Sequence, residues 1–205
     1  MDHFHEVGQK TRDAAVEAVQ KLPFCELIRG AEIVRRDKDG NEVTVSEEEL
    51  AELAKGEKLL GIYFSAGWCG PCRRFTPMLV SLYMAWKARG VPYEVLFVPW
   101  DHSEEGYEEY TTQAEMPWPM IRFGQQNVIS MFTMRYDVKG IPALFVLEGG
   151  SEGGSLHRLP TEAREDVERH GFDAIDKWQQ MAEERAEGQE QAGGSLSQQT
   201  KDRSQ

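Results

Sequence analysis

Two cysteines separated by two residues, Cys69 and Cys72 in the segment Trp68-Cys69-Gly70-Pro71-Cys72, are the residues whose types and spacing most clearly permit chemistry. Two sulfurs at this spacing can close a small disulfide ring and open it again by thiol-disulfide exchange. The pair stands between the apolar run 59–64 and a long amphipathic segment, where a strand gives way to a helix. The unpaired N–H groups and positive dipole end of the first helical turn favour the thiolate of Cys69, which is the attacking form.

The residues between the cysteines suit this position. Pro71 lacks an N–H group that would be unpaired at the start of a helix, and Gly70 leaves the backbone beside the attacking sulfur uncrowded. A structural zinc site and a static disulfide are the alternatives. The chain has only three cysteines, and no second CxxC or closely spaced histidine pair completes a zinc site. A ring this short constrains the unfolded chain little, so a purely stabilising disulfide explains the pair poorly.

The 205 residues are enough for one sizeable core. We expect an N-terminal extension over 1–23, a single domain over 24–187 and a tail over 188–205. The tail is rich in Gln, Ser, Gly and charge, so we expect it to lack order. The third cysteine, Cys25, lies in an apolar patch and is expected to be free and buried, as a small hydrophobic residue.

The net charge of -12 argues against a nucleic-acid or anionic-membrane surface, because phosphates would be repelled. No apolar run approaches the length that spans a bilayer, and the first residues lack a secretory signal pattern. A cytoplasmic, reducing compartment is therefore the default expectation.

Hydrophobic periodicity predicts the elements that position the cysteines. The run 59–65 is apolar nearly throughout, as in a strand that helices bury on both faces. From Cys72 onward, apolar residues recur at steps of three and four, so one helical face packs on the sheet and carries Cys72 inward as the resolving sulfur. The other predicted elements are helices over 11–22, 103–113, 125–136 and 161–187, with a possible break at Gly171, a short helix after Ser46, a hairpin over 31–45, and strands over 93–98, 143–147 and 155–159.

Further candidates lie at the ends of the later strands. Sites in such sheets gather beyond the carboxyl ends of central strands, so we expect Asp101 and His102 near the sulfurs. Pro142 heads a strand and is either an ordinary edge feature or a cis residue that leaves its backbone free for a ligand. The residues alone favour the ordinary edge feature.

The order of these elements resembles the thioredoxin fold. More narrowly, the segments 63–77, Pro99-Trp100-Asp101 and Met116-Pro117-Trp118 are similar to the tryparedoxin and nucleoredoxin branch, over about residues 24–159. The resemblance implies an α/β three-layer sandwich, with a mixed central sheet flanked by helices. The residue pattern adds an N-terminal hairpin and a helical C-terminal extension. It also implies a thiol-disulfide oxidoreductase that needs no metal or organic cofactor.

Matching positions imply roles for individual residues. Cys69 would be the exposed nucleophile and Cys72 the resolving thiol, with Trp68 as a lid beside their disulfide. Pro142 would be the cis proline that faces the disulfide, and Ile141 would offer backbone hydrogen bonds to a substrate chain. The motif also places Gly70, Pro71 and Arg73 at the substrate surface, Arg73 close enough to favour the thiolate or an anionic substrate.

Two positions depart from the family pattern. Tryparedoxins usually carry proline in the place of Gly70, and Tyr63 stands where thioredoxins carry a buried aspartate that assists proton transfer. Asp101 is then the nearest candidate for handling the proton.

The sequence therefore predicts a reductase of protein disulfides. Its expected partners are disulfide-containing proteins, with peroxiredoxins among the candidates, and a low-molecular-weight dithiol or a flavoenzyme as reductant. The alternative is a redox-regulated protein-binding module in which the same dithiol gates association and turnover is incidental.

Overall fold

The computed structural model describes residues 13–53, 58–149 and 156–202, and a mixed sheet lies at the centre of the molecule. Its strands are β1 (Ile33–Arg36), β2 (Glu42–Thr44), β3 (Leu59–Ser65), β4 (Tyr93–Pro99), β5 (Met120–Ile121), β6 (Ala143–Gly149) and β7 (Leu156–Arg158). They lie in the order β2-β1-β5-β4-β3-β6-β7. Strands β3, β4 and β5 run parallel to one another, and the other neighbours pair antiparallel.

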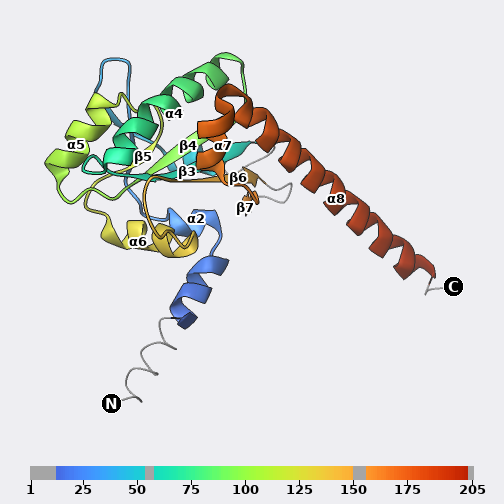
Figure 1. Ribbon diagram of the computed structural model, residues 1–205. Coiled ribbons are helices and arrows are strands. Elements are labelled where there is room, and N and C mark those ends of the chain that lie inside the picture. The colour runs from blue at the N-terminus through green and yellow to red at the C-terminus, as the bar shows by residue number, and fades with distance from the viewer. Residues whose placement is uncertain (1–12, 54–57, 150–155, 203–205) are drawn as a thin grey trace.

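Helices cover both faces of this sheet. Residues 13–21 are helical. The later helices are α2 (Phe24–Leu27), α3 (Glu47–Leu53), α4 (Gly70–Ala88), α5 (Glu104–Gln113), α6 (Gln126–Arg135), α7 (Ala163–His170), the 3-10 turn η1 (Gly171–Asp173) and α8 (Ala174–Asp202). Helices α4, α5, α7 and the start of α8 pack on one face, and α2, α3 and α6 pack on the other (Figure 1). The molecule is therefore the expected α/β three-layer sandwich. No helix in the described ranges combines the length and apolarity required to cross a bilayer.

Strand β3 is the centre of the core, and all seven of its residues are buried. Because successive side chains point to opposite faces, Tyr63 joins the cluster under α4 and α5, whereas Ile62 and Phe64 join the cluster under α6. Strand β3 pairs with β4 on one side and β6 on the other, so the redox turn that follows it begins in the middle of the sheet.

Strand β5 was not predicted. Met120 pairs with Phe97 of β4 and with Val34 of β1, so this short strand connects the hairpin to the parallel strands. Two residues are too few to show an alternating pattern, and the two preceding prolines concealed the strand.

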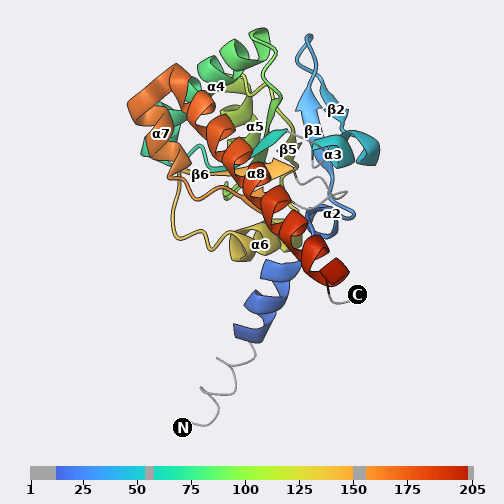
Figure 2. The same ribbon diagram turned by 90° about the vertical axis from the view of Figure 1, so that its right-hand side faces the viewer.

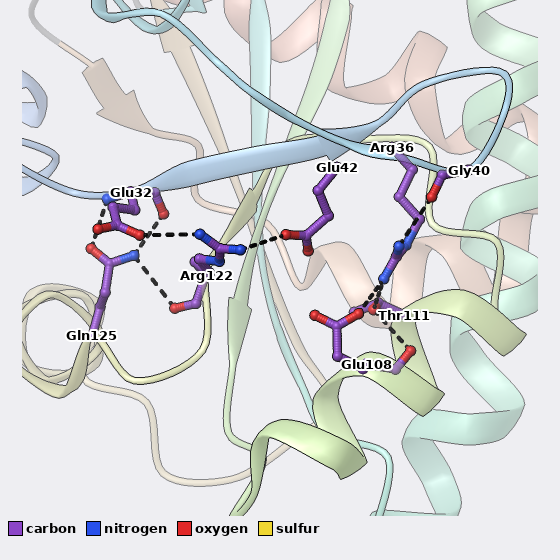
Figure 3. A network of polar contacts seen from close by, with 8 residues as sticks. All are labelled: Glu32, Arg36, Gly40, Glu42, Glu108, Thr111, Arg122 and Gln125. Atoms are coloured by element: carbon purple, nitrogen blue, oxygen red, sulfur yellow. Dashed lines mark hydrogen bonds and ion pairs between the residues drawn. The ribbon is translucent and has the colours of Figure 1, made fainter.

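A network of charged residues fixes the hairpin to the rest of the molecule (Figure 3). The Arg36 guanidinium donates to a Glu108 carboxylate oxygen of α5 at 2.7 Å. Arg122, after β5, lies 3.1 Å from a carboxylate oxygen of Glu42 and 3.5 Å from one of Glu32. The Arg36 side chain is largely buried, so water screens the Arg36–Glu108 ion pair less than it screens a surface ion pair. The network thus joins β1 to α5, the helix that begins beside the redox turn, and joins β2 to the residue that follows β5.

Two expectations about single residues were wrong. Cys25 is free but exposed, because α2 directs Phe24 and Leu27 into the core and leaves the residue between them outside. The apolar spacing over 161–187 also makes Phe172 one of the residues able to cover the sheet, but it lies in η1 with 36% of its surface exposed, under the Arg89 guanidinium.

The C-terminal helix is longer than composition predicted. Gly171 breaks the helical stretch as expected, with a positive φ of 53°. However, α8 continues to Asp202, through the stretch that was expected to lack regular structure. The buried Ile175 and Trp178 anchor its first turns, and Gln, Glu and Ala are good helix formers that allow it to propagate. The boundaries of the predicted domain and tail remain predictions.

Candidate active site

The two sulfurs lie at the start of α4, immediately after β3. Cys69 is the N-cap residue of α4, and its sulfur accepts a hydrogen bond from the backbone N–H of Cys72 at 3.2 Å. The sequence had placed Cys69 inside the first turn, and the structure places it one position earlier. The two residues form a disulfide, with Cα atoms 5.2 Å apart. When the disulfide opens, the same N–H stabilises the Cys69 thiolate at the positive end of the helix.

The two cysteines differ in accessibility. Cys72 is fully buried, whereas 6% of the Cys69 surface is exposed. Cys69 is thus the more accessible residue of the pair, although it is less exposed than the resemblance implied. Its sulfur lies 3.7 Å from the carbonyl oxygen of Ile141. The Ile141-Pro142 peptide bond is cis, so the resemblance was right on this point and the ordinary edge feature was the wrong choice.

Trp68 directly precedes Cys69 in the chain, and 55% of its surface is exposed. Its indole stacks on the His102 ring, with the ring centres 4.9 Å apart and the planes 8° from parallel. Its Nε1 donates to the carbonyl oxygen of Trp100 at 2.9 Å. These contacts hold the indole beside a groove of about 820 Å³ that continues along α6 to Lys139. The contacts with His102 and Trp100 thus hold the Trp68 side chain in place, while its exposed part is open to a partner.

Asp101 lies under the same turn. One carboxylate oxygen accepts a hydrogen bond from the Gly67 N–H at 2.8 Å, two residues before Cys69. The other oxygen is buried and has no hydrogen-bond partner within the described ranges. Burial raises the pKa of Asp101 above its ordinary value, although the Gly67 hydrogen bond opposes the rise. A carboxyl with a raised pKa can exchange protons nearer neutral pH than an ordinary aspartate.

Four buried hydroxyl groups form a closed ring below the cysteine turn. The Tyr63 hydroxyl contacts Ser65 Oγ at 3.1 Å and Thr76 Oγ1 at 2.6 Å. The Tyr110 hydroxyl closes the ring, at 2.7 Å from Ser65 and 2.5 Å from Thr76. Each hydroxyl can donate one bond and accept one, so all four can be satisfied. The ring joins β3, α4 and α5 in the space where Tyr63 replaces the thioredoxin aspartate.

Burial raises the pKa of Tyr63 far above the physiological range. The phenol therefore stays protonated, and it serves as a neutral member of the ring, not as an ionised base. Asp101 is the carboxyl group that hydrogen-bonds to the turn, through the Gly67 N–H.

The remaining predicted site residues lie on the surface of the turn. Pro71 occupies the first turn of α4, and the Arg73 side chain is exposed and without an ion pair among the described residues. A Cβ built on Gly70 would find only the end of the Arg74 side chain, at 4.0 Å. Space around the Cβ position therefore does not require glycine here.

The structure brings Trp68, Asp101 and Ile141, which the sequence singled out, to the cysteine turn, and their roles stay predictions. Sequence reasoning missed the hydroxyl ring, because Ser65, Thr76 and Tyr110 come from three elements and only Tyr63 was singled out. A buried strand that ends in serine, facing polar residues on the inner sides of two helices, was the available signal. Among the described residues, no group of three or more histidine, cysteine, aspartate or glutamate side chains could hold a metal ion.

A strand-to-helix turn that carries a closed cysteine pair, beside a cis proline in this sheet order, defines a thiol oxidoreductase of the thioredoxin type. A thioredoxin-like family model matches residues 56–152. The probable nucleoredoxin 1 of Arabidopsis thaliana is 39% identical over 137 residues, which are 67% of this chain and 21% of that protein. The tryparedoxin of Trypanosoma brucei brucei is 33% identical over 107 residues, which are 52% of this chain and 69% of that protein.

A solved structure of tryparedoxin II complexed with glutathionylspermidine superposes with a TM-score of 0.58 and 30% identity, over 72% of this chain and 92% of that one. The chain therefore belongs to the thioredoxin-like family, in its tryparedoxin and nucleoredoxin branch. The match spans about a fifth of the length of the plant nucleoredoxin, so the activity of that whole protein does not carry over to this chain.

Proposed function

We propose that this chain reduces disulfide bonds of protein substrates by dithiol exchange. The observation that carries the proposal is the difference between the sulfurs at the start of α4. Cys69 is the less buried residue, and its sulfur accepts the Cys72 N–H and lies near the Ile141 carbonyl, whereas Cys72 is fully enclosed. This asymmetry assigns the attack to Cys69 and the resolution to Cys72.

The reaction proceeds in two exchanges. The Cys69 thiolate attacks one sulfur of the substrate disulfide and releases the other as a thiolate, leaving a mixed disulfide. Cys72 then loses its proton and attacks Cys69, which forms the Cys69-Cys72 bridge and releases the second substrate thiolate. Asp101 is the group that we assign to proton exchange with the site, and a dithiol reductant returns two electrons to the bridge. Trp68, Ile141 and Pro142 would border the bound substrate, with Gly70, Pro71 and Arg73 at its edge.

The test is the rate of insulin disulfide reduction with dithiothreitol, glutathione or trypanothione as electron donor. Cys69→Ser should reduce the rate to the uncatalysed background, because no nucleophile remains. Cys72→Ser should accumulate a mixed disulfide with the substrate that is detectable by mass. Cys25→Ser is the matched control, and it should retain the full rate because Cys25 lies on α2, on the opposite face of the sheet from α4.

Wild-type turnover no faster than that of Cys69→Ser would contradict the proposal. If capture of a protein partner then changed with oxidation of the pair, the redox-regulated binding module would be the better interpretation. The donor that supports the fastest turnover would identify the class of reductant.

A further inference from the structure

A second groove lies away from the redox turn, where α2 packs beside α6 and the chain returns through β7 (Figure 1). Its volume is about 730 Å³, within the range of small-molecule sites. It shares no lining residue with the groove beside Trp68. Its floor is apolar and is made largely of core residues such as Phe24, Leu27 and Leu147.

The charge of this groove is opposite to that of the whole chain. The chain carries 35 aspartates and glutamates against 23 lysines and arginines, yet among the described residues four lysines or arginines, one histidine and no aspartate or glutamate line the groove. The five are Lys21, Arg135, His157, Arg158 and Arg185. Such a concentration of one sign in a concave site attracts ligands of the opposite sign.

Not all five charges are available. Lys21 pairs with Glu17 at 2.7 Å, and Arg185 pairs with Glu148 at 2.6 Å. His157 is partly buried, and burial together with Arg185 lowers its pKa, so it is mainly neutral at physiological pH. Two guanidinium groups, those of Arg135 and Arg158, remain without a carboxylate partner among the described residues.

Both free guanidinium groups are held at the groove. The Arg158 guanidinium lies over the Phe145 ring, 4.3 Å from its centre. Arg135 donates to the backbone carbonyl of Gln20, and its Nε is buried without a partner in the part of the chain that the structure describes. Both residues line the groove together with Tyr136, and both guanidinium groups lower the pKa of the Tyr136 hydroxyl, which burial raises. A pair of held, unpaired guanidinium groups is a suitable receptor for carboxylates.

The exposed thiol of Cys25 lies on the wall of the same groove. We propose that the basic groove binds small carboxylate-bearing ligands and directs disulfides of this class to Cys25. The Cys25 thiolate attacks one sulfur of such a disulfide, the sulfur-sulfur bond breaks, and the other half leaves as a thiolate that takes a proton from water. The low-molecular-weight disulfide is the oxidant, and the product is a mixed disulfide on Cys25. Ligands held by the guanidinium groups would be concentrated in the groove that Cys25 lines, which would raise the rate of exchange at this thiol.

The test uses the full chain with Cys69 and Cys72 closed as their disulfide, so Cys25 is the free thiol and the result does not depend on the proposed reductase activity. The rate of adduct formation is measured by intact mass with glutathione disulfide, which is anionic, and with hydroxyethyl disulfide, which is neutral. Each rate is divided by the rate of the same reagent with a short cysteine peptide, which corrects for the intrinsic reactivity of the reagent. The wild type should favour the anionic reagent, and added salt should remove the preference.

Arg135→Gln and Arg158→Gln should each lower the anionic preference about threefold, the effect of one charge at roughly 6 Å in water. Arg164→Gln is the matched control, because Arg164 is exposed on α7 and outside this groove, and it should change nothing. Equal relative rates for the two reagents, or a preference that persists in both groove variants, would overturn the proposal. The salt dependence of the wild type decides the question even if a variant folds poorly.

Discussion

Asp101 combines a position under the redox turn with an unsatisfied carboxylate oxygen. Burial raises its pKa, so the folded chain holds this proton more tightly than the unfolded chain, whose aspartates titrate near 3.9. The contribution of this proton to stability is complete below the unfolded pKa. It is lost as the pH rises through the higher folded pKa, where the carboxyl ionises in a buried place.

Asp101→Asn should therefore be more stable than the wild type at neutral pH, by about 1 kcal/mol, because an amide keeps the Gly67 hydrogen bond without a buried charge. The difference should shrink toward pH 4, as the wild-type carboxyl gains its proton. Urea unfolding between pH 4 and 8 measures it. Asp137→Asn, at an exposed aspartate that pairs with Lys139, is the control without such a trend. If the free energies of unfolding of Asp101→Asn and the wild type changed with pH in parallel, the raised pKa of Asp101 would be ruled out.

At the scale of elements, the hydroxyl ring explains how β3, α4 and α5 keep their positions around the cysteines. Thr76→Val preserves shape but opens the ring, leaving the Tyr63 and Tyr110 hydroxyls with one partner each. We expect a loss of about 1–3 kcal/mol in the free energy of unfolding. Thr133→Val is the matched control, since that hydroxyl donates only to Ile129 within its own helix and should cost less. Equal losses from the two substitutions would show that the ring adds nothing to stability.

The sequence was sufficient to predict those elements whose residue pattern is local. Strand β3 is apolar throughout because helices cover both its faces, and the capping box at Ser46 and Glu49 forms both of its reciprocal hydrogen bonds. The cysteine turn was equally visible, because all its chemistry lies within five consecutive residues.

Features that depend on tertiary contacts could not be predicted from the sequence. The four-residue helix α2 is too short for periodicity to decide which side faces inward, so Cys25 was assigned to the core. The basic groove joins Arg135 and Arg158 to Cys25, more than 100 positions earlier in the chain. No pattern along the chain indicates which charges meet when residues this distant fold together.

At the scale of the whole molecule, the chain after β7 covers one side of the core through α7 and the start of α8. The buried carboxylate of Asp166 in α7 accepts hydrogen bonds from Trp178 Nε1 at 3.0 Å and from Lys177 at 2.5 Å. The Trp178 ring packs against Trp86 of α4 and Tyr93 of β4. Figure 2 shows α8 passing diagonally over the β6 side of the sheet, where Arg185 pairs with Glu148 of β6. The start of α8 is therefore part of the core.

We therefore expect the start of α8, which contains Trp178, to affect stability much more than the part of α8 after Glu187. Trp178→Ala removes a large buried side chain and two of its aromatic contacts, which costs about 3–5 kcal/mol and lowers the melting temperature by about 10 °C or more. A chain that ends at Glu187 retains Trp178 and the Arg185 ion pair, so its melting temperature should fall by less than about 2 °C. Thermal unfolding followed by circular dichroism compares both with the full chain. A large loss on truncation would move the predicted domain boundary beyond residue 187, because residues 188–205 would then contribute to the folded core.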